Sequence, residues 1–136
     1  ARSLHSSAYA REQITASYLA QDAVEVVRNL RDDNSLAGAD WLRFISKCLN
    51  QSCIVNSDVR GEKSLAVCST LPCDGLLYNE SSQLYTYDIG TPSSFVRELT
   101  VREVKPTEVE VVSTVSWSVG LLSRSISITN YLHDWK

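Results

Sequence analysis

Apolar residues in the first third of the chain recur at helical spacing. From Leu4 to Leu30 there is neither Pro nor Gly, and good helix formers dominate. The apolar positions follow one another in steps of three and four residues, which places them on one helical face. The residues of this stripe, which we expect to pack against a sheet, are Ala16, Leu19, Ala20, Ala23, Val26, Val27 and Leu30. The pattern predicts a long helix over residues 1–35, with Gly38 as its stop or turn residue.

The periodicity changes from helical to alternating after Gly75, as is typical of strands. The strands that we expect there cover residues 76–78, 84–87, 95–104, 109–119 and 124–129. The register of the 95–104 strand stays open, because apolar residues fall on both of its faces. In the 109–119 strand, Val111, Val115 and Trp117 alternate with polar residues, so we expect them to face the helix.

The order of these segments predicts one domain of α+β class, a long N-terminal helix packed on an antiparallel sheet of about four strands. Its parts are the helix at 1–35, a cysteine-containing connector at 36–75 with a short strand at 64–67, and an antiparallel β-meander at 76–136. A length of 136 residues suits one modest core and is too short for two ordinary domains.

Composition narrows the function classes. Apolar residues make up 43% and charged residues 21% of the chain, so neither disorder nor a membrane-embedded body is indicated. No apolar run reaches the length of about eighteen residues that a membrane-spanning helix needs. Acids and bases are mixed along the chain and give a net charge of -3, which argues against nucleic acid as a partner.

The four cysteines form two pairs with the same internal spacing, Cys48 with Cys53 and Cys68 with Cys73. Zinc sites usually use tighter CxxC knuckles, and His is absent nearby. Two disulfides formed in an oxidising compartment are therefore favoured over a metal site or free thiols. Four cysteines allow three connectivities, and proximity favours pairing within each short loop.

No motif predicts catalysis, a cofactor or a metal site. His133 lies beside Asp134, but sequence adjacency brings no nucleophile to them. The run Asp32, Asp33 and Asn34 offers oxygens to calcium, yet no D-x-D-x-D-G loop follows, and such a run is also an ordinary helix end. The chain has no G-x-S-x-G, HExxH or phosphate-binding glycine loop. We therefore expect no enzymatic activity.

The segment ITASYLAQDAVEVVRNLRDDN resembles the stretch after the transmembrane segment in bacterial type IV pilin-like proteins of the prepilin-type N-terminal methylation family. The matching positions are Leu19, Ala20, Gln21, Glu25, Arg28, Arg31, Asp32 and Asn34. The string V-x-S-x-V-x-W at 111–117 and a closing Y-L-x-x-W are similar to the C-terminal part of the same group, often described as PilV-like minor pilins. The connector is unmatched.

The resemblance implies a pilin fold and a structural role as a subunit, a minor pilin, of a type IV pilus or related filament in assembly, adhesion or motility. Implied partners are other pilin subunits, the pilus assembly machinery and a host-cell or surface ligand. The implied location is an extracellular pilus, with the precursor held in the inner or cytoplasmic membrane. The family's cleavage junction and apolar anchor are missing before Ala1, so we expect the anchor to have been deleted. The alternatives are a secreted binding module or adhesin that does not polymerise, and a type II secretion pseudopilin.

Overall fold

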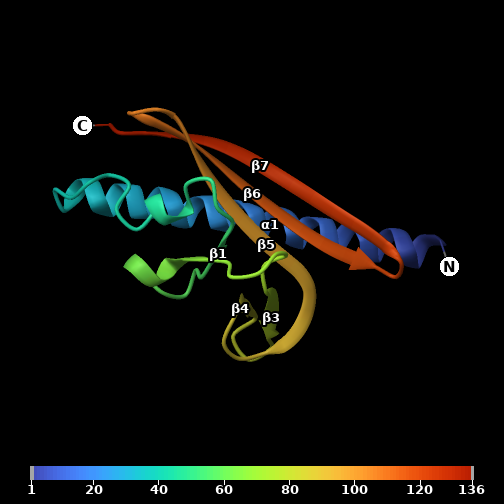
Figure 1. Ribbon diagram of the computed structural model, residues 1–136. Coiled ribbons are helices and arrows are strands. Elements are labelled where there is room, and N and C mark those ends of the chain that lie inside the picture. The colour runs from blue at the N-terminus through green and yellow to red at the C-terminus, as the bar shows by residue number, and fades with distance from the viewer. Residues whose placement is uncertain (1, 136) are drawn as a thin grey trace.

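The computed structural model describes residues 2–135, which form one long helix and a seven-stranded antiparallel sheet (Figure 1). The elements in chain order are α1 (Arg2–Leu36), η1 (Ser46–Cys48), β1 (Cys53–Val55), η2 (Gly61–Ser64), β2 (Leu65–Val67), β3 (Gly75–Asn79), β4 (Leu84–Thr86), β5 (Thr91–Lys105), β6 (Glu108–Val119) and β7 (Leu122–His133). No helix within the described residues is both long enough and apolar enough to cross a bilayer.

Helix α1 has 35 residues, which corresponds to a length of about 52 Å. It ends in a Schellman motif: the Ala39 N–H donates to the Asn34 carbonyl at 2.9 Å, and the Gly38 N–H donates to the Ser35 carbonyl at 3.2 Å. Gly38 has a φ of +71°, a conformation that costs glycine least. Gly38 is therefore where the chain turns back toward the sheet.

Strand β5 organises the sheet. One of its edges pairs with β6, which pairs in turn with β7. Its other edge is shared by two hairpins, β1–β2 through the pair Cys53 and Leu99, and β3–β4 through pairs such as Leu77 and Pro92. The β6–β7 hairpin closes in a two-residue turn, because Val119 still pairs with Leu122.

The predicted fold, with an antiparallel sheet of about four strands following the connector, is wrong. The sheet has seven strands, and two of them, β1 and β2, lie in the segment expected to be a connector. The sheet is also not a simple meander, since β5 pairs with β1, β3 and β6. The short strand expected at 64–67 corresponds to β2, which pairs with β1. Strand β1 was not expected, because its pairing with β5 joins segments remote in sequence and local pattern does not reveal it.

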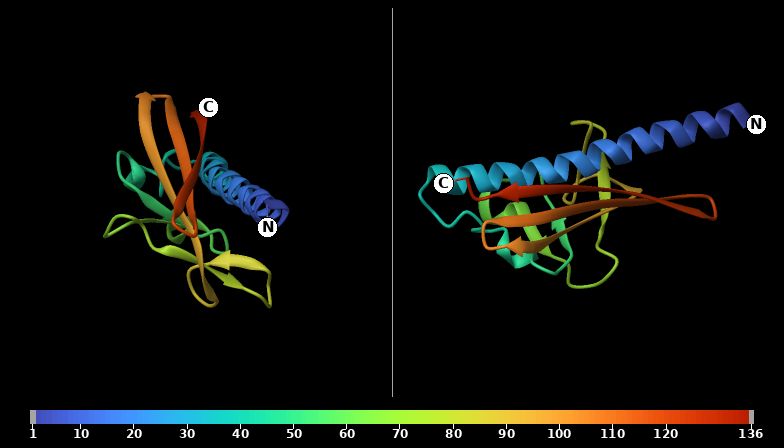
Figure 2. Two further views of the ribbon diagram at one scale, coloured as in Figure 1. Left: turned by 90° about the vertical axis from the view of Figure 1, so that its right-hand side faces the viewer. Right: turned by 90° about the horizontal axis from the view of Figure 1, so that it is seen from above.

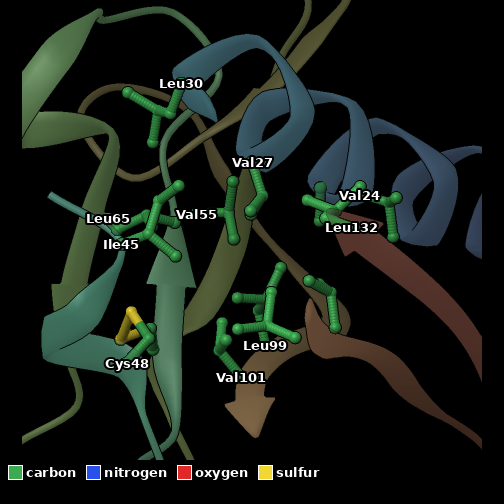
Figure 3. Packing of buried hydrophobic residues seen from close by; sticks show 14 of the residues in the cluster. Val24, Val27, Leu30, Ile45, Cys48, Val55, Leu65, Leu99, Val101 and Leu132 are labelled. Carbon is green, nitrogen blue, oxygen red and sulfur yellow. A yellow bond between two sulfur atoms is a disulfide. The ribbon is translucent and has the colours of Figure 1, made fainter. Parts of the chain in front are cut away.

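Two apolar clusters join the helix to the sheet. Figure 3 shows the larger cluster, in which side chains of α1 meet those of β1, β2, β5 and β7 and of the segment before η1. The residues labelled there are Val24, Val27, Leu30, Ile45, Cys48, Val55, Leu65, Leu99, Val101 and Leu132. The smaller cluster joins the middle of the helix to the other end of the sheet through Ala16, Leu19, Ala20, Leu76, Phe95, Val115 and Trp117.

Two contacts join the helix to β7. The Arg31 Nη1 donates to the His133 carbonyl at 3.4 Å near one end, and the Arg124 guanidinium carbon lies 4.9 Å from the Tyr9 ring centroid near the other. Toward its N-terminus, α1 diverges from the β6–β7 hairpin, as the right-hand view of Figure 2 shows. The burial of α1 side chains by the sheet therefore begins at Ala16 and continues to Leu30.

Candidate functional site

The helix stripe expected to pack on the sheet is buried, except at Val26. The buried members are Ala16, Leu19, Ala20, Ala23, Val27 and Leu30. Val26 is half-buried and lines a surface hollow beside the loop at 57–61. Val24, which the sequence reasoning left out, is fully buried against the sheet. The buried face is therefore broader than the predicted stripe, because residues of β1 and β2 join those of β5, β6 and β7 in one cluster against α1.

The expected sheet residues Val111, Val115 and Trp117 all lie on the buried face of β6. The Trp117 ring centroid is 6.1 Å from that of Phe95, within the usual range for aromatic pairs. Ala16 and Ala20 face these aromatic rings in the same cluster. Small residues at these two positions leave room for the large rings between helix and sheet.

The four cysteines form two disulfides, Cys48 with Cys53 and Cys68 with Cys73, each spanning five positions. The first bridge is fully buried and belongs to the larger apolar cluster, where it fastens the first residue of β1 to the last residue of η1. The second bridge lies near the surface between β2 and β3. Cys53 pairs with Val67 and the Cys68 N–H donates to the Ser52 carbonyl, so both bridges hold the open end of the β1–β2 hairpin.

The residues that matched the family motif have three different environments. Leu19 and Ala20 belong to the core, and Gln21 is exposed. Ion pairs join Glu25 to Arg28 and Arg31 to Asp32 on the helix surface, the latter at 3.0 Å. The Glu25–Arg28 pair is partly exposed, and pairs of this kind contribute little to stability. Arg31 also donates to the His133 carbonyl, so it joins the helix to β7.

Asn34 stabilises the end of the helix. Its side-chain amide, 1% exposed, donates to the carbonyls of Trp41 at 3.1 Å and Arg43 at 2.8 Å, and its oxygen accepts from the Arg43 Nε at 3.3 Å. Because this amide group is fully engaged with the following turn, the Asp32 to Asn34 run acts as a helix end. Within the described part of the chain, no group of three or more His, Cys, Asp or Glu side chains has the arrangement of a metal site.

A buried arginine, Arg97, is the polar residue that sequence reasoning missed. It lies on the inner face of β5 between Phe95 and Leu99 and is 1% exposed. Its Nη1 donates to the Leu19 carbonyl at 3.0 Å and lies 3.4 Å from the Asp22 carboxylate, while its Nη2 donates to the Val55 carbonyl at 2.6 Å. One side chain thus joins β5 to the helix and to β1.

The titratable groups near the sheet lie in separate places, Tyr87 under the inner face and Glu110, Glu108 and His133 on the outer part of β6 and β7. Burial raises the pKa of the Tyr87 hydroxyl, and the neighbouring Arg97 charge lowers it by less. On the outer face, hydrogen bonds from Arg102 and Tyr131 lower the pKa of Glu110. The His133 Nε2 lies 2.9 Å from a Glu108 carboxylate oxygen at the ends of β6 and β7, where 57% of the His133 side chain is exposed.

A groove of about 700 Å³ lies between the middle of α1 and the β3–β4 hairpin, with the loop at 57–58 at its edge. Its walls include the exposed side chains of Ile14, Tyr18 and Leu84, of which 70%, 56% and 51% of the surface is exposed. Two acids, Asp22 and Asp58, also line it, and no Lys or Arg is among its described lining residues. Among the described residues, this is a surface with apolar walls and acidic edges whose apolar side chains are open to solvent.

Comparison of the chain with protein-family models, with curated proteins and with solved structures gives no match.

Proposed function

We propose that the chain is a structural subunit of a type IV pilus or a related extracellular filament, without catalytic activity. The observation that carries the proposal is the helix α1, whose residues from Ala16 to Leu30 are packed on the sheet while the residues before Ala16 diverge from it (Figure 2). The exposed apolar side chains of Ile14 and Tyr18 lie in and beside that upstream part.

A long helix with one docked part and one uncovered part suits assembly. The docked part gains stability from burial of its apolar face, whereas an isolated helix of about fourteen residues is marginal in water. Packing between copies would supply the missing burial upstream of Ala16. The resemblance of residues 14–34 to the helix of type IV pilin-like proteins points in the same direction.

The two disulfides also support an extracellular role. Bridges of this kind persist in oxidising compartments and are rare where thiols are kept reduced. They hold the β1–β2 hairpin, which contributes Val55 and Leu65 to the core. A subunit that remains folded outside the cell benefits from such cross-links.

Immunogold electron microscopy tests the proposal. Antibodies raised against the 136-residue chain should label surface filaments of the source cells, and deletion of the gene should remove the label and change filament number or length. Complementation with the intact gene provides the control. Recovery of the protein only as a soluble monomer in the culture medium, with filaments unlabelled and unchanged by the deletion, would establish the secreted binding module instead.

A further inference from the structure

The turn of the β6–β7 hairpin exposes leucine where turns usually carry polar residues. Gly120 and Leu121 form the turn, with Gly120 at a φ of +61°. Leu121 is fully exposed and Leu122 is 60% exposed. Turn positions favour Gly, Asn, Asp and Ser for conformational reasons, so the turn itself gives no reason for two leucines.

The surroundings of this turn are uncharged or positive. From Val111 to Asn130 the sequence holds one charged residue, Arg124, which lies on β7 close behind the turn. The groove between α1 and β3–β4 is acidic at its loop edge, because Asp58 lines it and its described lining residues include no base, while the second acid, Asp22, lies 3.4 Å from the buried Arg97. The turn and the groove are thus both apolar and have complementary charge.

We propose that the β6–β7 turn of one copy of this chain inserts into the groove between α1 and the β3–β4 hairpin of a second copy. Leu121 and Leu122 contact Ile14, Tyr18 and Leu84 of that copy. This inference rests on the proposed function and adds to it the surface through which copies meet.

The positions of turn and groove imply an open series of copies. The contact between Arg124 and Tyr9 gives a common reference point for β7 and α1. Leu121 is three strand residues from Arg124, so it lies about 10 Å from this point, toward the helix N-terminus. Tyr18 lies nine helix residues, about 13 Å, from Tyr9 in the other direction. Parallel copies joined in this way are displaced by roughly 23 Å along the helix, and the joined pair keeps one turn and one groove free.

The contact is small, so we expect it to be weak between free chains and effective when copies are held close together. Interfaces that bury well under about 1,200 Å² are typical of transient association. A contact made by Leu121, Leu122 and the residues beside them buries an area in this smaller range. Covalent trapping is therefore the appropriate measurement.

Cysteine cross-linking of two variants tests the contact directly. All four native cysteines are in disulfides, so an added cysteine supplies the reactive thiol. A mixture of Leu121→Cys and Leu84→Cys proteins under mild oxidation should give mixed dimers about tenfold faster than a mixture of Leu121→Cys and Leu71→Cys. Leu71 is the matched control because it is 70% exposed and does not line the groove. Equal rates in the two mixtures, or faster Leu121→Cys homodimers, would overturn the proposal.

Charge substitutions at the turn provide a second readout. Leu121→Asp should weaken self-association measured by sedimentation, whereas Leu121→Lys should weaken it less, because the groove is acidic. Leu71→Asp should have no effect, and unchanged thermal unfolding of all three variants shows that they fold. The mass of the wild-type protein should grow past that of a dimer with concentration. A mass that stops at the dimer, or Asp and Lys variants that behave alike, would contradict the proposed series.

The same variants separate this inference from the proposed function. Labelled filaments that persist in cells producing Leu121→Asp would refute the turn–groove contact and leave the subunit role intact. Unlabelled filaments in cells producing the wild-type chain would refute the subunit role itself.

Discussion

Replacement of Arg97 by Met is the most informative perturbation of this fold, because Met keeps an unbranched side chain and removes only the charged donors. The Leu19 carbonyl lies inside α1 and keeps its helical hydrogen bond when the arginine is lost. The Val55 carbonyl does not have this alternative. The N–H of the next residue, Asn56, donates to the Ser64 carbonyl and therefore points toward the β2 side. The carbonyl and N–H of one peptide group point in opposite directions, so the Val55 carbonyl points away from β2 and toward β5.

Two opposing effects determine the magnitude. Burial of a guanidinium costs several kcal/mol, and the Nε of Arg97 has no hydrogen-bond partner, which makes this cost larger. Hydrogen bonds from charged donors return about 1.5–3 kcal/mol each. The net contribution of Arg97 to the free energy of unfolding is therefore close to zero. The destabilisation by Arg97→Met comes from the Val55 carbonyl, which loses its donor, and should be about 1–3 kcal/mol. Arg97→Ala adds a cavity and should cost about 3–5 kcal/mol.

Urea unfolding followed by tryptophan fluorescence measures both variants. Trp41 and Trp117 are 7% and 3% exposed, so their emission reports loss of the core. The disulfides stay oxidised, and an unchanged urea dependence shows that the denatured state is comparable. At about 4 °C per kcal/mol for a chain of this length, Arg97→Met should lower the melting temperature by roughly 4–12 °C.

Asp22→Asn is the matched control for the ion pair. The Asp22 side chain is 28% exposed and its oxygen lies 3.4 Å from Arg97, so its loss should cost under about 1 kcal/mol. An Arg97→Met protein as stable as the wild type, or more stable, would refute the reasoning. It would mean that the Val55 carbonyl finds another donor and that Arg97 does not tie β1 to β5.

Three further outcomes are expected. Replacing both cysteines of the Cys48–Cys53 bridge by Ala should lower the free energy of unfolding more than the same change at Cys68–Cys73. Each short loop contributes about 2 kcal/mol of chain entropy, but only the first bridge is fully buried. Equal losses of stability in urea unfolding would contradict this. Asn34→Ala should cost about 2–3 kcal/mol by leaving two carbonyls unpaired, and the exposed Asn29→Ala should cost under about 0.5 kcal/mol in the same assay. Because the pKa of Tyr87 is raised in the native state, wild-type stability should fall as pH rises above about 10, and Tyr87→Phe should reduce that slope in urea midpoints taken from pH 8 to 11.

Segments with a long regular pattern could be placed from the sequence alone. The helix predicted at 1–35 corresponds to α1, and the strand expected at 109–119 corresponds to β6. In both, the periodicity persists over many residues, so accidental matches average out. Strand β1 has only three residues and sits among turn formers, and its one ladder pair with β5 joins Cys53 to Leu99. No local signal announces such a long-range pairing.

The register of β5 shows why the polar contacts could not be predicted. Phe95, Leu99 and Val101 are buried on one face, and Arg97 shares that face. A charged residue in the middle of an apolar alternation makes both registers equally plausible by pattern. Its placement becomes clear only once the Leu19 and Val55 carbonyls, remote in sequence, are known to lie within its reach.

The helix upstream of Ala16 links the stability of the subunit to its assembly. Its described side chains include Tyr9, held under Arg124, and the exposed Ile14. A cation–π contact contributes about 0.5–1 kcal/mol at an exposed position, which is less than the cost of ordering even one residue of backbone. The upstream helix therefore depends on continuity with the docked part, and its amide protons should exchange faster than those between Ala16 and Leu30. If the turn of a neighbouring copy fills the groove at Ile14 and Tyr18, burial there should slow amide exchange around Ile14, in the upstream part that is otherwise less protected. Exchange that is equally slow along all of α1 in the free monomer would show that the upstream part needs no neighbour.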